Sequence, residues 1–172
     1  MHKHLRDVTC GGNEEHYRYL MSWMAQMIQQ QGETLGTAVV LRGPRGCGKT
    51  TLGYFLRQIV GPHHSRKVSQ GSHVTGHFNQ HMRDCLFFLV EEGVWGGDKK
   101  AEGVLKDLIT GDTAMIEGKG VNIFELFNYT RLMITSNAEW IVPAGPWERR
   151  YFILDVLDPF PELAEDDPAR KA

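Results

Sequence analysis

The glycine-rich segment Gly43–Thr50 constrains the fold of this chain more than any other part of its sequence. It reads Gly-Pro-Arg-Gly-Cys-Gly-Lys-Thr and matches the pattern G-x-x-x-x-G-K-[ST] at every defined position. An apolar, β-branched run at 37–41 precedes it, and a helical pattern at 49–60 follows it. The run lacks alternation, as a strand buried on both faces does, so the three parts together predict one unit of a parallel α/β sheet.

The rest of the chain repeats this alternation of apolar runs and helical stretches. Four parallel strands interleaved with helices predict an α/β fold in which a central parallel sheet is covered by helices on both faces. The strands are expected at 37–41, 85–90, 131–135 and 151–155, and the helices at 13–32, 49–60 and 99–109.

Three shorter elements and two flanking segments complete the prediction. Residues 1–12 lack periodicity and are expected to form a loop, and the tail after Pro159 is acidic and expected to be loose. We therefore divide the chain into an N-terminal helical segment (1–34), a core (35–157) and an acidic flexible tail (158–172). The shorter elements are a strand at 67–69, a helix around 78–83 and a hairpin at 113–122 that turns at 118–120.

The composition fits one globular domain. The chain has 172 residues, of which 41% are hydrophobic and 23% charged, as in a folded protein. The net charge of -2 excludes a uniformly basic surface for nucleic acid, although not a local basic patch. No apolar run is long enough to cross a bilayer, and no apolar segment follows the basic start as in a secretory signal.

The cysteines and histidines give no strong sign of a metal site. Cys10, Cys47 and Cys85 are odd in number, far apart and outside any CxxC pattern, so we interpret them as free thiols in a reducing compartment. His73, His77 and His81 are spaced so that they would share one face of a helix. Gly76 interrupts that run and favours a helix start, so we expect these histidines to be structural.

The glycine-rich segment also carries the chemistry of phosphate binding. Glycines let backbone N–H groups converge on a phosphate without a Cβ clash, and the following helix adds the positive end of its dipole. Lys49 would reach the β- and γ-phosphates, and the Thr50 hydroxyl would hold Mg²⁺. The candidate nucleotide-binding residues are Gly43, Pro44, Arg45, Gly46, Cys47, Gly48, Lys49, Thr50 and Thr51.

Polar residues follow two of the predicted strands and precede a third. Glu91 and Glu92 come directly after a strand, where parallel sheets bind ligands, so Glu91 is a candidate metal-side acid and Glu92 a candidate base. Asn137, after the strand at 131–135, would hold the attacking water or the γ-phosphate. Either Arg149 or Arg150, before the last strand, would neutralise transition-state charge, and such an arginine can act on a neighbouring subunit.

In this order, the parts resemble the superfamily 3 helicases, which are AAA+ ATPases of small DNA viruses, phages and plasmids. The similarity is closest to the helicase-like domain of phage and prophage primase–helicase proteins, and it extends from about residue 5 to residue 155. The segments that carry it, besides the glycine-rich one, are 77–81, 92–99, 105–109, 116–120, 135–140 and 142–152.

The resemblance implies a P-loop ATPase of the AAA+ type that uses ATP and Mg²⁺ and moves along single-stranded DNA during replication. It implies the roles given above for Lys49, Thr50, Glu91 and Glu92, and makes Asn137 a polar sensor. Arg150 best matches the arginine finger, with Arg149 as the alternative.

The resemblance also extends to partners. Lys119 lies where the family's central-channel hairpin carries a DNA-tracking basic residue. It further implies a homo-oligomer, usually a hexameric ring, with a primase or other replication proteins as partners and no membrane. The expected location is the cytoplasm of a bacterial host, with a phage or prophage origin.

Two other readings of the sequence stay open. A small P-loop kinase for a nucleotide or metabolite would share the phosphate loop, but would need a lid that binds its acceptor. A truncated remnant would bind ATP without hydrolysing it and act only as an assembly partner. Hydrolysis measured with and without DNA separates these readings.

Overall fold

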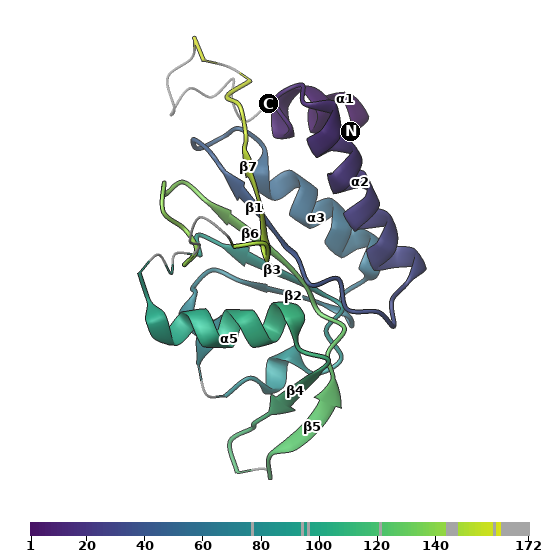
Figure 1. Ribbon diagram of the computed structural model, residues 1–172, viewed down its shortest axis with the longest axis vertical. Coiled ribbons are helices and arrows are strands. Elements are labelled where there is room, and N and C mark those ends of the chain that lie inside the picture. The colour runs from purple at the N-terminus through teal and green to yellow at the C-terminus, as the bar shows by residue number, and fades with distance from the viewer. Residues whose placement is uncertain are drawn as a thin grey trace.

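A parallel sheet forms the centre of the molecule (Figure 1). The computed structural model describes residues 1–76, 78–93, 95, 97–120, 122–143, 148–159 and 161–162. Within these residues the sheet has five strands in the order β2-β3-β6-β1-β7, all paired in parallel. The strands are β1 (Ala38–Arg42), β2 (Ser65–Val68), β3 (Phe87–Glu91), β6 (Arg131–Ser136) and β7 (Tyr151–Asp155).

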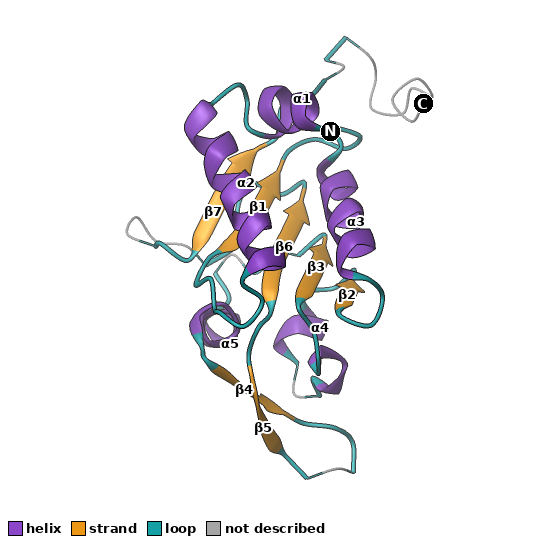
Figure 2. Cartoon of the chain, turned by 90° about the vertical axis from the view of Figure 1, so that its right-hand side faces the viewer, coloured by secondary structure: helices purple, strands orange, loops and turns teal. Residues whose placement is uncertain are grey.

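Helices cover both faces of this sheet, which confirms the predicted α/β architecture (Figure 2). On one face α2 (Glu14–Gln29) and α3 (Lys49–Val60) pack against alternate residues of β1, such as Val39 and Leu41. On the other face α4 (Ser72–Thr75) and α5 (Lys99–Thr110) pack against Ala38 and Val40. The central strands are therefore apolar on both faces, which is why their sequences show no alternation.

The N-terminal segment differs from the prediction of a loop. It forms α1 (His2–His4) and one turn of π-helix, η1 (Leu5–Thr9). Leu5 and Cys10 are buried in the same core as α2, so the segment folds because it covers apolar surface of the sheet layer. Its short, His-rich sequence lacks the periodicity that would have predicted a helix.

A second correction concerns the hairpin predicted at 113–122. The hairpin consists of β4 (Thr113–Ile116) and β5 (Phe124–Phe127), paired antiparallel so that Ile116 lies opposite Phe124. The second strand therefore begins after the segment in which the turn and return were expected. The hairpin extends from the end of the molecule opposite to the glycine-rich segment (Figures 1 and 2).

Asn79 explains a third difference, at the helix predicted around 78–83. Only a turn of 3-10 helix, η2 (Gln80–Met82), forms there among the described residues. The Asn79 amide donates a hydrogen bond to the Met115 carbonyl at 2.8 Å and accepts one from the Glu117 N–H at 2.8 Å. These bonds tie Asn79 to the end of β4, and they compete with helix formation in the segment that follows.

The remaining elements agree with the sequence or lie outside the described residues. The strand predicted at 67–69 is β2, shifted toward the N-terminus, and Cys10, Cys47 and Cys85 are free and buried. Most of the tail predicted at 158–172 lies outside the described residues. None of the helices in the described ranges combines the length and apolarity needed to cross a membrane.

A buried arginine fastens α2 to the sheet. Arg131, the first residue of β6, is 1% exposed. Its guanidinium donates hydrogen bonds to the carbonyls of Gln30 (3.0 Å) and Glu33, after the end of α2, and of Tyr129 (2.6 Å). Burial lowers the pKa of Arg131, while the cation stabilises the carbonyls that end the helix.

We expect Arg131→Met to destabilise the protein by about 3 kcal/mol, because it leaves several carbonyls without a donor in a buried place. Urea unfolding followed by circular dichroism measures this loss. The control is Arg18→Ala, at a side chain that is 77% exposed, and it should change the free energy of unfolding by less than about 0.5 kcal/mol. Equal effects of the two substitutions would contradict this role of Arg131.

Candidate functional site

The carboxyl ends of β1, β3 and β6 open onto a hollow of about 310 Å³. This is the edge at which parallel α/β sheets bind ligands. Most residues singled out in the sequence for phosphate and metal chemistry lie together here. The lining residues are Arg45, Gly46, Lys49, Thr50, Ser69, Glu91, Glu92, Thr135, Ser136 and Asn137.

The strand register explains why Glu92 and Asn137 meet. Glu91 of β3 lies opposite Thr135 of β6, so the residues that follow the two strands leave the sheet at the same level. The Asn137 amide nitrogen lies 3.4 Å from the Glu92 carboxylate and donates a hydrogen bond to it. Glu92 itself adopts a φ of 56°, a left-handed backbone conformation that is uncommon for a non-glycine residue and typical of functional turns.

Lys49 is folded back onto its own loop. The side chain is buried, and its ammonium donates hydrogen bonds to the Gly43 carbonyl at 2.7 Å and to the Pro44 carbonyl. The Cys47 sulfur lies 3.6 Å from the same nitrogen. The loop carbonyls therefore hold this cation in the wall of the hollow.

Glycine is required where the loop begins. A Cβ at Gly43 would lie 2.6 Å from the Val156 carbonyl oxygen, which is a backbone atom and has no freedom to rotate away. At the other end of the loop Gly48, the residue before α3, has a φ of 86°. The His4 ring packs so closely against it that a Cβ would lie 2.9 Å from that ring. The N-terminal segment thus packs directly against the end of the loop.

Glu91 is held by two residues that the sequence analysis did not single out. Its carboxylate forms an ion pair with Lys67 of β2 at 2.7 Å and accepts a hydrogen bond from the Tyr54 hydroxyl of α3 at 2.9 Å. Lys67 also donates to the Tyr54 hydroxyl at 3.1 Å, and its bond to Glu91 raises the pKa of Lys67. The adjacency of β2 and β3 creates this cluster, and no local pattern signals it.

The two candidate finger arginines lie at the other end of the sheet. The Arg150 carbonyl accepts a hydrogen bond from the N–H of Ala38 at 2.8 Å, which places the arginines beside the start of β1. The Arg150 guanidinium pairs with Glu148 of the same chain, whereas Arg149 is exposed. Neither arginine reaches the hollow of its own chain, and the exposed Lys119 of the β4–β5 turn does not reach it either.

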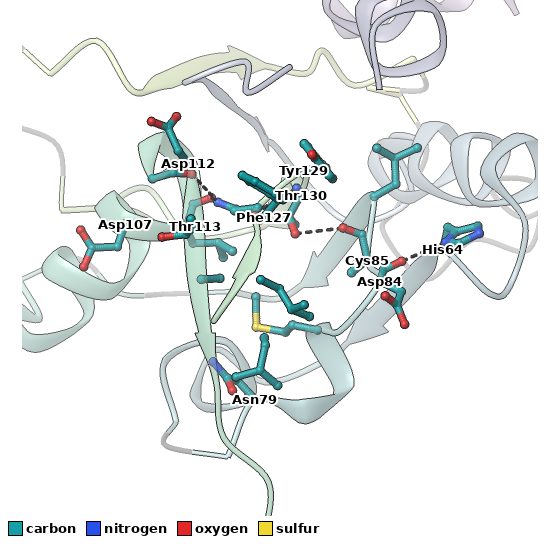
Figure 3. Close-up of a pocket in the computed structure, with 18 of the residues that line it drawn as sticks. His64, Asn79, Asp84, Cys85, Asp107, Asp112, Thr113, Phe127, Tyr129 and Thr130 are labelled. Carbon is teal, nitrogen blue, oxygen red and sulfur yellow. Dashed lines mark hydrogen bonds between the residues drawn. The ribbon is translucent and has the colours of Figure 1, made fainter. Parts of the chain in front are cut away.

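A larger hollow, of about 840 Å³, is lined by residues of β4, β5 and α5 and of the body of the molecule (Figure 3). Figure 3 shows Asp107 and Asp112 on one side of it and Asp84 on the other. No lysine or arginine is among the described residues that line it. Asp107 and Asp112 make this lining unfavourable for phosphate, whereas Arg45 and Lys49 line the smaller hollow, which is therefore the better anion site in spite of its size.

The histidine run shows no metal site in the part of the chain that the structure describes. No group of three His, Cys, Asp or Glu side chains there is placed to hold a metal ion. His77 lies outside the described residues, as do Val94, Gly96 and 144–147, which belong to segments that carry the helicase resemblance.

The sequence identifies the family. The model of one protein family, described as "Family of unknown function (DUF5906)", matches residues 41–150, which is more than half of the chain and includes the glycine-rich loop, both glutamates and the arginine pair. The chain belongs to this family. No curated protein matches it.

Solved structures of a protein called NrS-1 share the fold. One apo structure of the NrS-1 C-terminal region (305–718) has a TM-score of 0.83 and 22% identity, covering 98% of this chain and 41% of that one. An A-form apo structure of the same region has a TM-score of 0.80 and 21% identity, covering 98% of this chain and 40% of that one. The chain thus spans about two fifths of the structures it matches.

We expect Gly43→Ala to destabilise the protein by about 2 kcal/mol, because the added methyl group forces the loop away from the backbone of Val156. The matched control is Gly103→Ala in α5, where a Cβ meets no atom within 4 Å. That change should stabilise the helix by about 0.8 kcal/mol. Thermal unfolding of both variants measures the difference, and a loss of stability in both would refute the close-approach argument.

Proposed function

We propose that this chain is the ATP-hydrolysing motor of a superfamily 3 type DNA helicase that works in phage-type replication. The observation that carries the proposal is the meeting of Lys49, Thr50, Glu91, Glu92 and Asn137 in one hollow at the carboxyl edge of a parallel sheet. These are the groups that a P-loop ATPase needs for phosphate, metal and water. The resemblance across residues 5–155 supplies the reaction class.

The residues present fit ATP and Mg²⁺. Lys49 gives a cation beside the backbone of a glycine-rich loop, which suits a triphosphate. Thr50 and Glu91 give hard oxygen donors in the same hollow, and Mg²⁺ is usually held by one or two such groups plus phosphates. When bound, Mg²⁺ would neutralise charge on the β- and γ-phosphates.

Three side chains of the hollow take the other roles in ATP hydrolysis. Glu92 accepts the proton of the water that attacks the γ-phosphate, and Asn137, within 3.4 Å of it, orients the carboxylate and the water. Lys49 exchanges its bonds to the Gly43 and Pro44 carbonyls for bonds to phosphate oxygens. These bonds stabilise the transition state more than bound ATP, because the Lys49 ammonium faces the oxygens on which charge develops during the reaction.

The place of the arginines supports action between subunits. Arg149 and Arg150 lie beside the start of β1, while the hollow lies at the ends of the strands. An arginine finger from this pair therefore acts on a neighbouring copy, as in a ring with ATP at the interfaces. Because Glu148 already neutralises Arg150, the exposed Arg149 is the freer of the two candidates.

The hairpin is the proposed contact to single-stranded DNA. Lys119 is exposed in the turn of a hairpin that extends away from the body (Figure 1). Repeated around a ring, single lysines form a positive channel although each subunit carries a net charge of -2. Such a channel binds backbone phosphates with little sequence preference.

Phosphate release from ATP, measured with and without single-stranded DNA, tests the proposal. The unchanged protein should hydrolyse ATP faster with DNA, and Glu92→Gln should lower kcat at least about a hundredfold while ATP binding persists, because the base is lost. Phosphate transfer to a small molecule would instead indicate a kinase. ATP binding without turnover in the unchanged protein would indicate a non-hydrolysing assembly partner.

Lys119→Ala tests the DNA contact separately from hydrolysis. Fluorescence anisotropy with labelled single-stranded DNA should show weaker binding, and the slope of log K against log salt should fall by about 0.7 for each contacting subunit, since one phosphate contact is lost. Arg18→Ala, an exposed cation on α2, is the control and should leave the slope unchanged. Mass photometry with ATP and Mg²⁺ shows for both variants whether the oligomer is retained.

A further inference from the structure

The metal-side acid of the proposed site is already engaged within its own chain. Glu91 has two carboxylate oxygens, and each has a different partner. Lys67 lies 2.7 Å from one oxygen, and the Tyr54 hydroxyl lies 2.9 Å from the other. The side chain of Glu91 is only 17% exposed and that of Lys67 is 31% exposed, so water screens their attraction incompletely.

Each member of the cluster contacts the other two. Lys67 donates to the Tyr54 hydroxyl at 3.1 Å, and its ammonium also lies 5.2 Å from the centre of the Tyr54 ring. The cation thus contacts Tyr54 and Glu91 at once. Three elements meet here, since Lys67 comes from β2, Tyr54 from α3 and Glu91 from β3. A divalent cation that takes oxygen from Glu91 meets a cation already in place.

We propose that Lys67, with Tyr54, acts as a positioning residue that retains the Glu91 carboxylate in the nucleotide-free protein and releases it when Mg²⁺ and ATP bind together. The inference rests on the proposed function and deepens it, because Lys67 competes with Mg²⁺ for the Glu91 carboxylate. Mg²⁺ without the triphosphate gains too few ligands here to displace the ammonium. Lys67 therefore sets how much Mg²⁺ the site requires.

The test is a titration of Mg²⁺ at a fixed concentration of a fluorescent ATP analogue, read by fluorescence without turnover. Lys67→Met removes the competing cation and should lower the half-saturating Mg²⁺ concentration about fivefold, as expected for a partly exposed ion pair. Lys67→Arg keeps the charge and should stay within about twofold of the unchanged protein. Lys106→Met, on α5, is the matched control and should not move the midpoint.

Thermal unfolding separates this role from a purely structural one. Lys67→Met should lower the midpoint of unfolding without ligand, and the rise in that midpoint on adding Mg²⁺ and ATP should be larger than in the unchanged protein. A structural role predicts an equal loss with and without ligand and an unchanged Mg²⁺ requirement, which would overturn the inference. If Lys67→Met does not fold, Tyr54→Phe should shift the Mg²⁺ midpoint in the same direction, by about twofold.

The inference and the proposed function fail in different ways. If the unchanged protein shows no Mg²⁺-dependent binding of the ATP analogue, the proposed function is wrong and the inference fails with it. If the unchanged protein binds the analogue normally and neither Lys67→Met nor Tyr54→Phe lowers the Mg²⁺ midpoint, the inference alone is overturned.

Discussion

The register between the parallel strands is the constraint on which the candidate site depends. Glu91, Thr135 and Leu41 are register partners across β3, β6 and β1. The segments that follow these three residues therefore leave the sheet at the same edge. A slip of one residue in β3 would turn Glu91 to the opposite face and separate Glu92 from Asn137. The fully apolar centre of the sheet prevents such a slip, because both faces are packed against helices.

Much of this arrangement follows from local sequence signals. The apolar run before Gly43, the helix that begins at Lys49 and the two glutamates at the end of the apolar run of β3 are contiguous patterns, so the sheet, its helical cover and the carboxyl-edge hollow could be predicted. The grouping of Asn137 with the glutamates followed from one further rule, that parallel strands end at the same edge.

The rest depends on contacts between distant segments, which leave no local pattern. Lys67 meets Glu91 only because β2 is the neighbour of β3, and the N-terminal turn folds because Leu5 finds apolar surface to cover. The 3-10 turn at Gln80–Met82 replaces a predicted helix because Asn79 pairs with β4. In each place the tertiary partner, rather than intrinsic propensity, decides the outcome.

The attachment of the hairpin has a mechanical consequence. Asn79 bonds one side of β4, and the buried Asn128, just after β5, donates to the carbonyls of Leu108 and Gly111 at 2.8 and 2.9 Å. The base of the hairpin is therefore coupled to the end of α5, and α5 begins shortly after the glutamates of the hollow. The hairpin that carries Lys119 is thus fastened to the C-terminal end of α5, the helix whose N-terminal end follows the glutamates, so one helix links the nucleotide edge of the sheet to the hairpin.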